Sequence, residues 1–367
     1  MIRIRKRAAT PDLPAPAPNP DDPARILERA RELFRGGQRL EAIELLSVAN
    51  RRRRDPQLER ELVTMRFAAF QEIDWPSGPA TVPEPPEDLF PGATMPEIAH
   101  ADLTVERVRS AVLNHGCLIV RGLIDHETVD RLTSDVDRAL AAYDTWDTSR
   151  DLATAAPWYE PFAGEKTGVE RKFRRVVGSV LAVDSPPALF DVIEAFDRAG
   201  IRSVVQEFLG EQPALLAKKW TLRRVSHQAG QSDWHQDGAF MGGEIRSLNV
   251  WLSLSHCGDD APGLDVVARR LDHVVPTGTD GAFLNWTVGP GMVARVAGGA
   301  IERPIFEPGD ALIFDHLNLH RTAVDPGMTR DRYAIEAWFL APSTYGTMME
   351  EEREEGAPPR DQLPMVY

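Results

Sequence analysis

The sequence predicts a mainly β protein with flanking helices. From residue 176 onward, short apolar runs follow one another, most of them separated by Gly, Pro or Asp: VVGSVLAV, ALLAKKWTLRRV, SLNVWLSLS, GLDVV, MVARV, DALIF and YAIEAWFLA. Such a series without intervening helices is typical of an antiparallel sandwich or barrel, and not of a Rossmann or TIM layout. Helical periodicity recurs only at residues 188–197 and 201–209, which are expected to cover one face.

Helical periodicity also marks the first part of the chain. A helix starts at Asp22-Pro23, an N-cap followed by a proline at the first helical position, and stops at Gly36-Gly37. A second helix runs through Asn50, and residues 58–73 form a third. The small and large residues of the second helix (AIELLSVA) resemble a tetratricopeptide repeat (TPR), without a second copy. This TPR-like hairpin is expected to dock on the main domain or on a protein partner.

Composition divides the chain into five regions. The segment from Trp75 to Pro96 carries seven prolines and is expected to be an extended linker, and both ends of the chain have the composition of tails. The predicted division is a flexible tail at 1–20, a TPR-like helical segment at 21–73, a Pro-rich linker at 74–98, the main domain at 99–345 and an acidic tail at 346–367. Within the main domain, alternation in SLNVWLSLS predicts a half-buried strand.

Charge and cysteine content limit the function classes. Lys and Arg total 42 against 56 for Asp and Glu, so the net charge of -14 disfavours nucleic acid and anionic membranes as partners. Cys117 and Cys257 are too few for a disulfide framework, and neither an apolar signal region nor a transmembrane run is found. We expect a cytoplasmic protein that acts on a small molecule.

The stretch SDWHQDGAF contains the first candidate for a metal site. In an extended segment, residues two apart project to the same face, so His235 and Asp237 offer an imidazole and a carboxylate to one point. Two ligands are an incomplete site. Taken alone, the pair is read equally well as part of a solvated loop or as an N-cap.

A second constellation lies downstream. Asp325-Pro326-Gly327 predicts the turn of a hairpin, and His320 and Arg332 both lie six residues from its centre. Opposed residues of antiparallel strands share a face, so Arg332 is expected beside His320. Two histidines and one carboxylate form the facial triad that binds non-haem Fe(II) and leaves coordination positions open. A neighbouring guanidinium suits a co-substrate that carries an acid.

The order of these motifs is similar to that of a known family. W-H-x-D, a series of short strands, G-D-x-L-x-F, a histidine six residues later and R-x-R-Y-A together resemble the phytanoyl-CoA dioxygenase-like group of Fe(II)/2-oxoglutarate oxygenases over residues 103–342. The resemblance implies a double-stranded β-helix (jelly-roll, cupin-like) core. It implies an iron site and a 2-oxoglutarate pocket, with spacing that selects His320 over His316: iron ligands His235, Asp237 and His320, and pocket residues Arg332, Thr322, Lys219 and Thr221, the last two from the preceding strand.

The activity that the resemblance implies is O2-dependent oxidation of a small molecule, with decarboxylation of 2-oxoglutarate to succinate. The intact Asp237 favours hydroxylation or another O2-dependent oxidation over halogenation, because related halogenases replace this carboxylate by a small residue. The sequence departs from the family after the central strand, where APGLDVVARRLDHVVPTG stands in place of an Asn-Gly and P-G-S-H pattern. The spacing from His320 to Arg332 is also one residue longer than is common. The substrate therefore stays open.

Two other classes of function stay open as well. A zinc hydrolase can use the same His/Asp/His site around an activated water, although it leaves Arg332 unexplained. A non-catalytic scaffold could act instead through its TPR-like hairpin. Several further residues have two interpretations, one functional and one structural: His227, His256 and His273 as ligands or surface groups, residues 171–175 as an anion site or a solvated edge, and Trp158-Tyr159 as a lid or part of the core.

Overall fold

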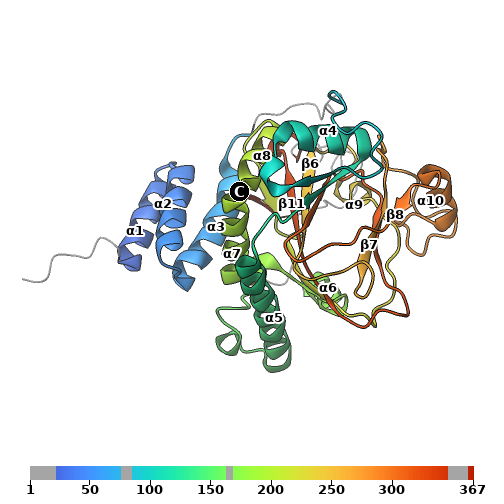
Figure 1. The fold of residues 1–367 in the computed structure, drawn as a ribbon. Coiled ribbons are helices and arrows are strands. Elements are labelled where there is room, and N and C mark those ends of the chain that lie inside the picture. The colour runs from blue at the N-terminus through green and yellow to red at the C-terminus, as the bar shows by residue number, and fades with distance from the viewer. Residues whose placement is uncertain (1–21, 76–84, 163–167, 346–362) are drawn as a thin grey trace, which may run out of the picture.

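The computed structural model describes residues 22–75, 85–162, 168–345 and 363–367 (Figure 1). The predicted 1–20 tail, residues 76–84 of the Pro-rich linker and most of the acidic tail lie outside these residues. The helices are α1 (Pro23–Arg35), α2 (Arg39–Arg52), α3 (Pro56–Glu72), α4 (Val105–His115), α5 (His126–Ser149), α6 (Gly168–Val176), α7 (Pro186–Arg198), α8 (Ile201–Leu209), α9 (Gly238–Met241) and α10 (Pro290–Ala297), with 3-10 turns at His100–Asp102, Leu152–Thr154 and Ala182–Asp184.

Two sheets form the centre of the molecule. The strands are β1 (Glu97–Ala99), β2 (Cys117–Arg121), β3 (Ser179–Leu181), β4 (Ala214–Leu216), β5 (Thr221–Val225), β6 (Ser247–Ser253), β7 (Gly263–Val267), β8 (Ile301–Glu302), β9 (Ala311–Phe314), β10 (His320–Ala323), β11 (Arg332–Leu340) and β12 (Pro364–Val366). The large sheet has the order β1-β2-β9-β6-β11-β4-β12, with β5 also on β11 and β3 on β5. The small sheet has the order β10-β7-β8. All pairs are antiparallel except β1 with β2. The prediction of sheets flanked by helices is confirmed at this level.

The prediction of a half-buried strand in SLNVWLSLS is wrong. All seven residues of β6 are buried, including Asn249 and Trp251 on the face that was expected to be exposed. The strand lies between β9 and β11 in the interior of the large sheet, where both faces are covered. Alternating polarity therefore reflects two buried environments here, and the second of them contains Arg332 beneath Trp251.

Two predicted strands have a different structure. The run MVARV lies in helix α10, because Pro290 occupies its first turn and Gly298, in the left-handed conformation, ends it. These terminal signals decide the conformation over the β-branched valines between them. The run ALLAKKWTLRRV is interrupted by a turn at 217–219, so it forms β4 and β5 and places Lys219 before the strand.

The predicted hairpin around Pro326 is also wrong. The turn itself exists, since the Met328 amide donates to the Asp325 carbonyl at 3.1 Å. Beyond it, the amides of Thr329 and Arg330 donate to the Asp260 carbonyl at 2.9 and 3.1 Å, so the chain turns away from the preceding strand. Strand β10 pairs with β7 in the small sheet and β11 pairs within the large one. The two strands therefore face each other from different sheets.

The turn that opens β9 shows how close packing selects a residue. Gly309, the glycine of the G-D-x-L-x-F motif, has φ 96°, which residues other than glycine rarely adopt. A Cβ atom added there would lie 2.4 Å from the Ile124 carbonyl oxygen. Glycine is therefore required on both conformational and steric grounds. Strand β9, which follows this turn, leads toward His320.

Three helices at one end of the molecule form the predicted N-terminal segment (Figure 1). Asp22 and Asp55 cap α1 and α3 by accepting from first-turn amides, and a proline follows each of them. Helix α3 packs on α7 and on β12, so the segment is covered by the main domain. Residues 363–367, which composition assigned to the acidic tail, instead form β12 and its flanks between α3 and β4. Within the described residues, no helix combines the length and apolarity needed to cross a membrane.

Glu59 of α3 predicts a pH-dependent stability. The side chain is 2% exposed, and burial, only partly offset by Arg54, raises the pKa of Glu59 from 4.5 to about 7. The folded state therefore binds a proton more tightly than the unfolded state, and stability falls as pH rises from about 4.5 to 7. We expect Glu59→Gln to raise the unfolding free energy at pH 8 by on the order of 1 kcal/mol or more and to change it little at pH 4.

Thermal melts at the two pH values measure this effect. Glu28→Gln, at an exposed position of α1, is the matched control and should leave both midpoints unchanged. Equal shifts of the Glu59→Gln midpoint at pH 4 and pH 8 would contradict the assignment.

Candidate metal centre and anion pocket

Main-chain pairing brings His235 and His320 together. The two residues form an antiparallel bridge, in which each amide donates to the carbonyl of the other at 3.0 and 3.1 Å. Their imidazole rings consequently lie 4.5 Å apart between centroids. This exchange joins the loop that contains W-H-x-D to the first residue of β10, eighty-five positions later. The two side chains therefore converge in the structure, as the sequence predicted.

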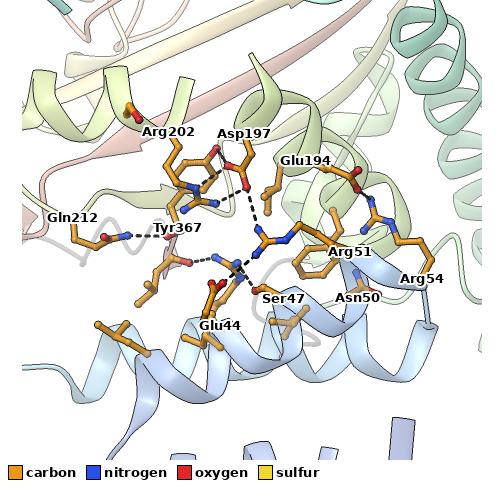
Figure 2. Close-up of a pocket in the computed structure, with 18 residues that line it drawn as sticks. Glu44, Ser47, Asn50, Arg51, Arg54, Glu194, Asp197, Arg202, Gln212 and Tyr367 are labelled. Carbon is orange, nitrogen blue, oxygen red and sulfur yellow. Dashed lines mark hydrogen bonds and ion pairs between the residues drawn. The ribbon is translucent and has the colours of Figure 1, made fainter. Parts of the chain in front are cut away.

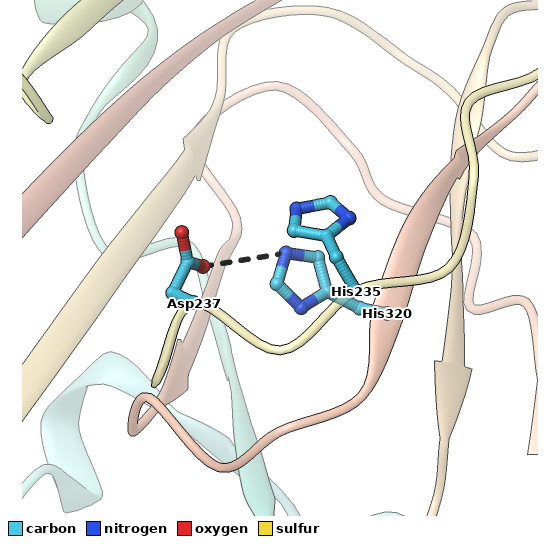
Figure 3. A group of neighbouring side chains, drawn as sticks. All are labelled: His235, Asp237 and His320. Atoms are coloured by element: carbon cyan, nitrogen blue, oxygen red, sulfur yellow. Dashed lines mark ion pairs between the residues drawn. The ribbon is translucent and has the colours of Figure 1, made fainter. Parts of the chain in front are cut away.

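Asp237 completes the cluster, although from a different conformation than predicted. His235 is extended, whereas Asp237 has helical angles and caps the short helix α9. Its Oδ2 lies 3.8 Å from Nε2 of His320, as Figure 3 shows. One potential ligand atom from each of the three residues lies within 4.8 Å of the others. The bend after His235 turns the carboxylate toward both rings.

Hydrogen bonds fix the orientation of both rings. Nδ1 of His235 donates to the Asp233 carbonyl and Nδ1 of His320 donates to the Asn318 carbonyl, each at 3.1 Å. A ring that carries its proton on Nδ1 presents an unprotonated Nε2, which is the form that binds metals. Burial, and then the neighbouring His320, lower the pKa of His235 to about 4, so this imidazole is neutral at neutral pH.

His316, the alternative ligand in the sequence, has another role. Its Nδ1 is hydrogen-bonded to the Ser247 hydroxyl at 3.0 Å and its Nε2 to the Gly243 carbonyl at 3.1 Å. Both ring nitrogens therefore have protein partners. Its own carbonyl accepts from the Gly238 amide, directly after Asp237. His316 holds the loop that carries the carboxylate and is not part of the cluster.

Gln236 holds the same loop from its other side, and sequence reasoning passed over it. The side chain is fully buried and makes three hydrogen bonds. Its amide nitrogen donates to the carbonyls of Leu317 at 2.7 Å and His273 at 3.0 Å, and its oxygen accepts from the Val275 amide at 2.8 Å. In the extended segment that the sequence predicts, Gln236 points away from the face shared by His235 and Asp237, which was the available signal.

Replacing Gln236 by alanine is expected to lower metal affinity about 10–100-fold and the unfolding free energy by about 1–3 kcal/mol. The change leaves the ligands in place but removes the hydrogen-bond partner of three main-chain groups. Anaerobic Fe(II) titration and denaturant melts measure the two effects. Gln228→Ala, at an exposed position before the loop, should change neither. Wild-type metal affinity in the Gln236→Ala variant would mean that the loop holds its shape without this side chain.

Arg332 is fully buried, and its guanidinium pairs with no carboxylate of the described residues. Its Nη1 donates to the Gly263 carbonyl at 2.8 Å and its Nη2 lies 3.5 Å from the Thr322 hydroxyl. Its Nε is buried and lacks a hydrogen-bond partner among the described residues, and no carboxylate of these residues forms an ion pair with it. Burial lowers the pKa of Arg332 to about 10, so the group still carries its charge at neutral pH. A buried charge of this kind is stabilised when an anion pairs with it.

The other predicted pocket residues differ in their placement. Thr322 lies next to Arg332, as predicted, from the facing sheet. Nζ of Lys219 lies 3.5 Å from Oδ1 of Asp237 and over the Phe240 ring, so it borders the metal cluster. Thr221 is fully buried, and its hydroxyl donates to the Glu336 carboxylate at 3.2 Å. Its hydroxyl thus has a protein partner within the large sheet.

An aromatic wall borders the cluster, and the sequence analysis did not include it. The ring of Phe240 stacks on His235 at 6.2 Å between centroids, and Trp286 lies edge-on to both at 6.0 and 5.6 Å. Phe240 lies in helix α9, and Asp237 is the N-cap residue of this helix. Trp286 comes from the segment between β7 and α10, a few residues after the stretch 261–278 in which the sequence departs from the family pattern. These rings limit access of water to one side of the cluster.

The remaining candidates have structural partners. The three further histidines named as candidates pair with acidic residues: His227 with Asp331, His256 with Asp259 and Glu307, and His273 with Asp272. In the basic run, Arg171 pairs bidentately with Asp184 and Arg175 with Asp144. Tyr159 is fully buried against Tyr143 and Trp146, as the core interpretation expects.

Comparison with known proteins shows a likeness of fold. No family model matches the sequence, and no curated protein is detectably similar to it. The structure is similar to that of EctD from S. alaskensis, crystallised with 2-oxoglutarate and 5-hydroxyectoine, with a TM-score of 0.51 and 16% identity over 75% of this chain and 86% of that one. EvdO2 from Micromonospora carbonacea var. aurantiaca, complexed with 2-oxoglutarate, has a TM-score of 0.40 and 16% identity over 64% and 90% of the two chains. The chain therefore has a fold similar to that of EctD.

Proposed function

We propose that this chain is a non-haem Fe(II)/2-oxoglutarate-dependent oxygenase that hydroxylates a small-molecule substrate on a double-stranded β-helix core. The observation that carries the proposal is the combination of two features. Two imidazoles with unprotonated Nε2 atoms meet one carboxylate, and a buried guanidinium that pairs with no carboxylate of the described residues faces the same strand, β10. The resemblance in sequence to the phytanoyl-CoA dioxygenase-like group supports the same assignment.

The donor set fits a ferrous ion. His235, Asp237 and His320 supply two neutral nitrogens and one anionic oxygen, which is the facial arrangement that leaves room for further ligands. The carbonyls of Asp233 and Asn318 hold the rings by their second nitrogens. Zinc accepts the same donors, so the ligands alone do not choose the metal.

The choice of a redox-active metal rests on Arg332. A planar guanidinium pairs bidentately with a carboxylate, and Arg332 has free donor capacity at Nε in a buried site. We propose that Arg332 and Thr322 bind the distal carboxylate of 2-oxoglutarate. The crystallisation of both EctD and EvdO2 with 2-oxoglutarate supports this proposal. A zinc hydrolase has no use for such a group.

Each residue then has a defined part. When bound, Fe(II), 2-oxoglutarate and O2 supply the oxidising power, with release of succinate and CO2. His235, Asp237 and His320 hold the ion, Arg332 orients the co-substrate, and Phe240 and Trp286 screen one side of the cluster from water. The substrate is expected to be a small molecule, because a net charge of -14 opposes nucleic acid and anionic membranes.

Anaerobic spectroscopy tests the proposal. Adding Fe(II) and 2-oxoglutarate without oxygen should produce the weak visible charge-transfer band of a chelated complex, and neither Fe(II) nor 2-oxoglutarate alone should do so. Admitting O2 should then consume 2-oxoglutarate and form succinate. A zinc hydrolase or a non-catalytic scaffold gives no band and no succinate. Absence of the band or absence of succinate formation would therefore overturn the proposal.

A further inference from the structure

A cavity of about 560 Å³ lies between the N-terminal helices and the main domain (Figure 2). Its walls come from α2, α3, α7, α8 and the chain around β12, and none of the three residues of the metal cluster lines it. The volume falls in the range of cavities that bind small molecules. Apolar side chains make up part of the wall, including Ile43, Leu62, Phe190 and Ile193.

Arg66 contributes a buried positive charge to this cavity. The side chain comes from the interior of α3 and is only 4% exposed. Nη1 donates to the Val366 carbonyl at 2.9 Å and Nη2 donates to the Ser47 hydroxyl at 3.2 Å, both of them neutral acceptors. Nε is buried without a hydrogen-bond partner among the described residues. Burial, reinforced by the nearby Arg202, lowers the pKa of Arg66 to about 10, so the charge persists at neutral pH.

The contrast with other buried arginines defines what is missing. Arg171 is equally buried, and two of its nitrogens bind the Asp184 carboxylate at 2.6 and 2.7 Å. Arg332 and Arg66 lack such a carboxylate among the described residues. A buried charge without a counter-charge costs several kcal/mol of folding free energy. In the function proposed above, Arg332 offsets this cost by binding the acid group of a co-substrate. For Arg66, a bound acid would offset the same cost.

The acidic residues of the cavity are already engaged with other arginines, as the dashed lines in Figure 2 show. Glu44 and Asp197 both pair with Arg51, at 3.1 and 3.6 Å, and Asp197 also binds Arg202 at 2.7 Å. Glu194 pairs with Arg54 at 3.2 Å. The face of Phe190, 6.0 Å from the Arg66 guanidinium, adds a weak attraction but no negative charge. The cavity thus combines a partly apolar wall with the buried guanidinium of Arg66, which pairs directly with no carboxylate of the described residues, although Asp197 and Glu44 act on it at longer range.

We propose that this cavity is a binding site for a small organic anion with an apolar body, such as a monocarboxylate, whose acid group pairs with Arg66. The apolar body would cover Leu62, Phe190 and Ile193, and the anion would supply the counter-charge that the described side chains leave out. The site is separate from the metal cluster, so the inference does not depend on the proposed oxygenase activity.

The anionic dye 8-anilinonaphthalene-1-sulfonate is the probe for this site, because it combines an acid group with an apolar body and fluoresces when it leaves water. We expect the full chain to bind it at one site and octanoate to displace it. Arg66→Met, which keeps the length of the side chain and removes the charge, should weaken binding about 30-fold or more. Ser203→Trp, which adds a large ring at an exposed position of the cavity lining on α8, should also block it.

Two controls make the result decisive. Arg332→Met should leave dye binding unchanged, which separates this cavity from the proposed 2-oxoglutarate pocket. Circular dichroism reports whether Arg66→Met is folded; if it is not, Ser203→Trp alone decides, since Ser203 is exposed. Dye binding that is absent from the wild-type chain, or that the folded variants retain at full strength, would overturn the proposal.

Discussion

His320→Ala is expected to weaken Fe(II) binding by more than about 100-fold and to abolish succinate formation. Removal of groups that merely orient a ligand costs about 10–100-fold in metal affinity, so loss of the ligand itself should cost more. The main-chain bridge to His235 does not involve the imidazole and can persist in the variant. Anaerobic equilibrium dialysis measures the affinity, and chromatography of succinate measures the turnover.

The matched control for this variant is His273→Ala. Its imidazole is 67% exposed at the side chain and pairs only with the neighbouring Asp272. Metal affinity and turnover should both stay at the wild-type level. Retention of Fe(II) binding by the His320→Ala variant would remove this histidine from the proposed ligand set, and a parallel loss in the His273→Ala variant would show that the assay responds to surface binding.

Arg332→Met is expected to weaken 2-oxoglutarate binding by about 100-fold or more while leaving Fe(II) binding within a few-fold of wild type. Removing one partner of a buried ion pair costs about 3–5 kcal/mol, and each 1.4 kcal/mol corresponds to a factor of about ten in affinity. Methionine keeps an apolar side chain over the Trp251 ring, where the guanidinium now lies. Titration of the charge-transfer band with 2-oxoglutarate gives the affinity directly.

Arg330→Met is the corresponding control, because Arg330 lies two residues earlier and its side chain is 64% exposed. It should bind 2-oxoglutarate like the wild-type chain. If Arg332→Met retains wild-type affinity for 2-oxoglutarate, the buried guanidinium has a purely structural role and the case against a zinc enzyme is lost. If Arg332→Met also loses Fe(II) binding, the variant has disturbed the scaffold. The Arg332→Lys variant must then decide whether the charge binds 2-oxoglutarate.

Sequence reasoning was most successful where the signal is local or where residue chemistry is distinctive. Helix α8 was predicted with its observed bounds, because Gly200 and Gly210 flank an unbroken apolar period. The convergence of His235, Asp237 and His320 was predicted from residue types and motif order. The helix α10 was missed, since its valines were weighed above the proline and glycine that begin and end it.

Long-range pairing was beyond the same reasoning. The sequence analysis expected Arg332 beside His320 through a hairpin. The structure instead places Nη2 of Arg332 3.5 Å from the hydroxyl of Thr322, two residues further along the strand of His320, and the two strands belong to different sheets. Strand β10 prefers β7, and this pairing joins residues that are more than fifty positions apart. Nothing local to residues 320–332 encodes it. The position of Gln236 was equally hidden, because its three partners are main-chain groups of distant segments.

The reciprocal bond between the main chains of His235 and His320 has a consequence for how the site comes into being. Because peptide groups rather than side chains join the two segments, the donor atoms are assembled by folding itself. Under the proposed function, we expect metal uptake to be a separate, later event that finds a preorganised receptor, unlike in zinc fingers, where the ion drives folding. The binding energy of the proposed ion would then be left for holding the co-substrate and oxygen.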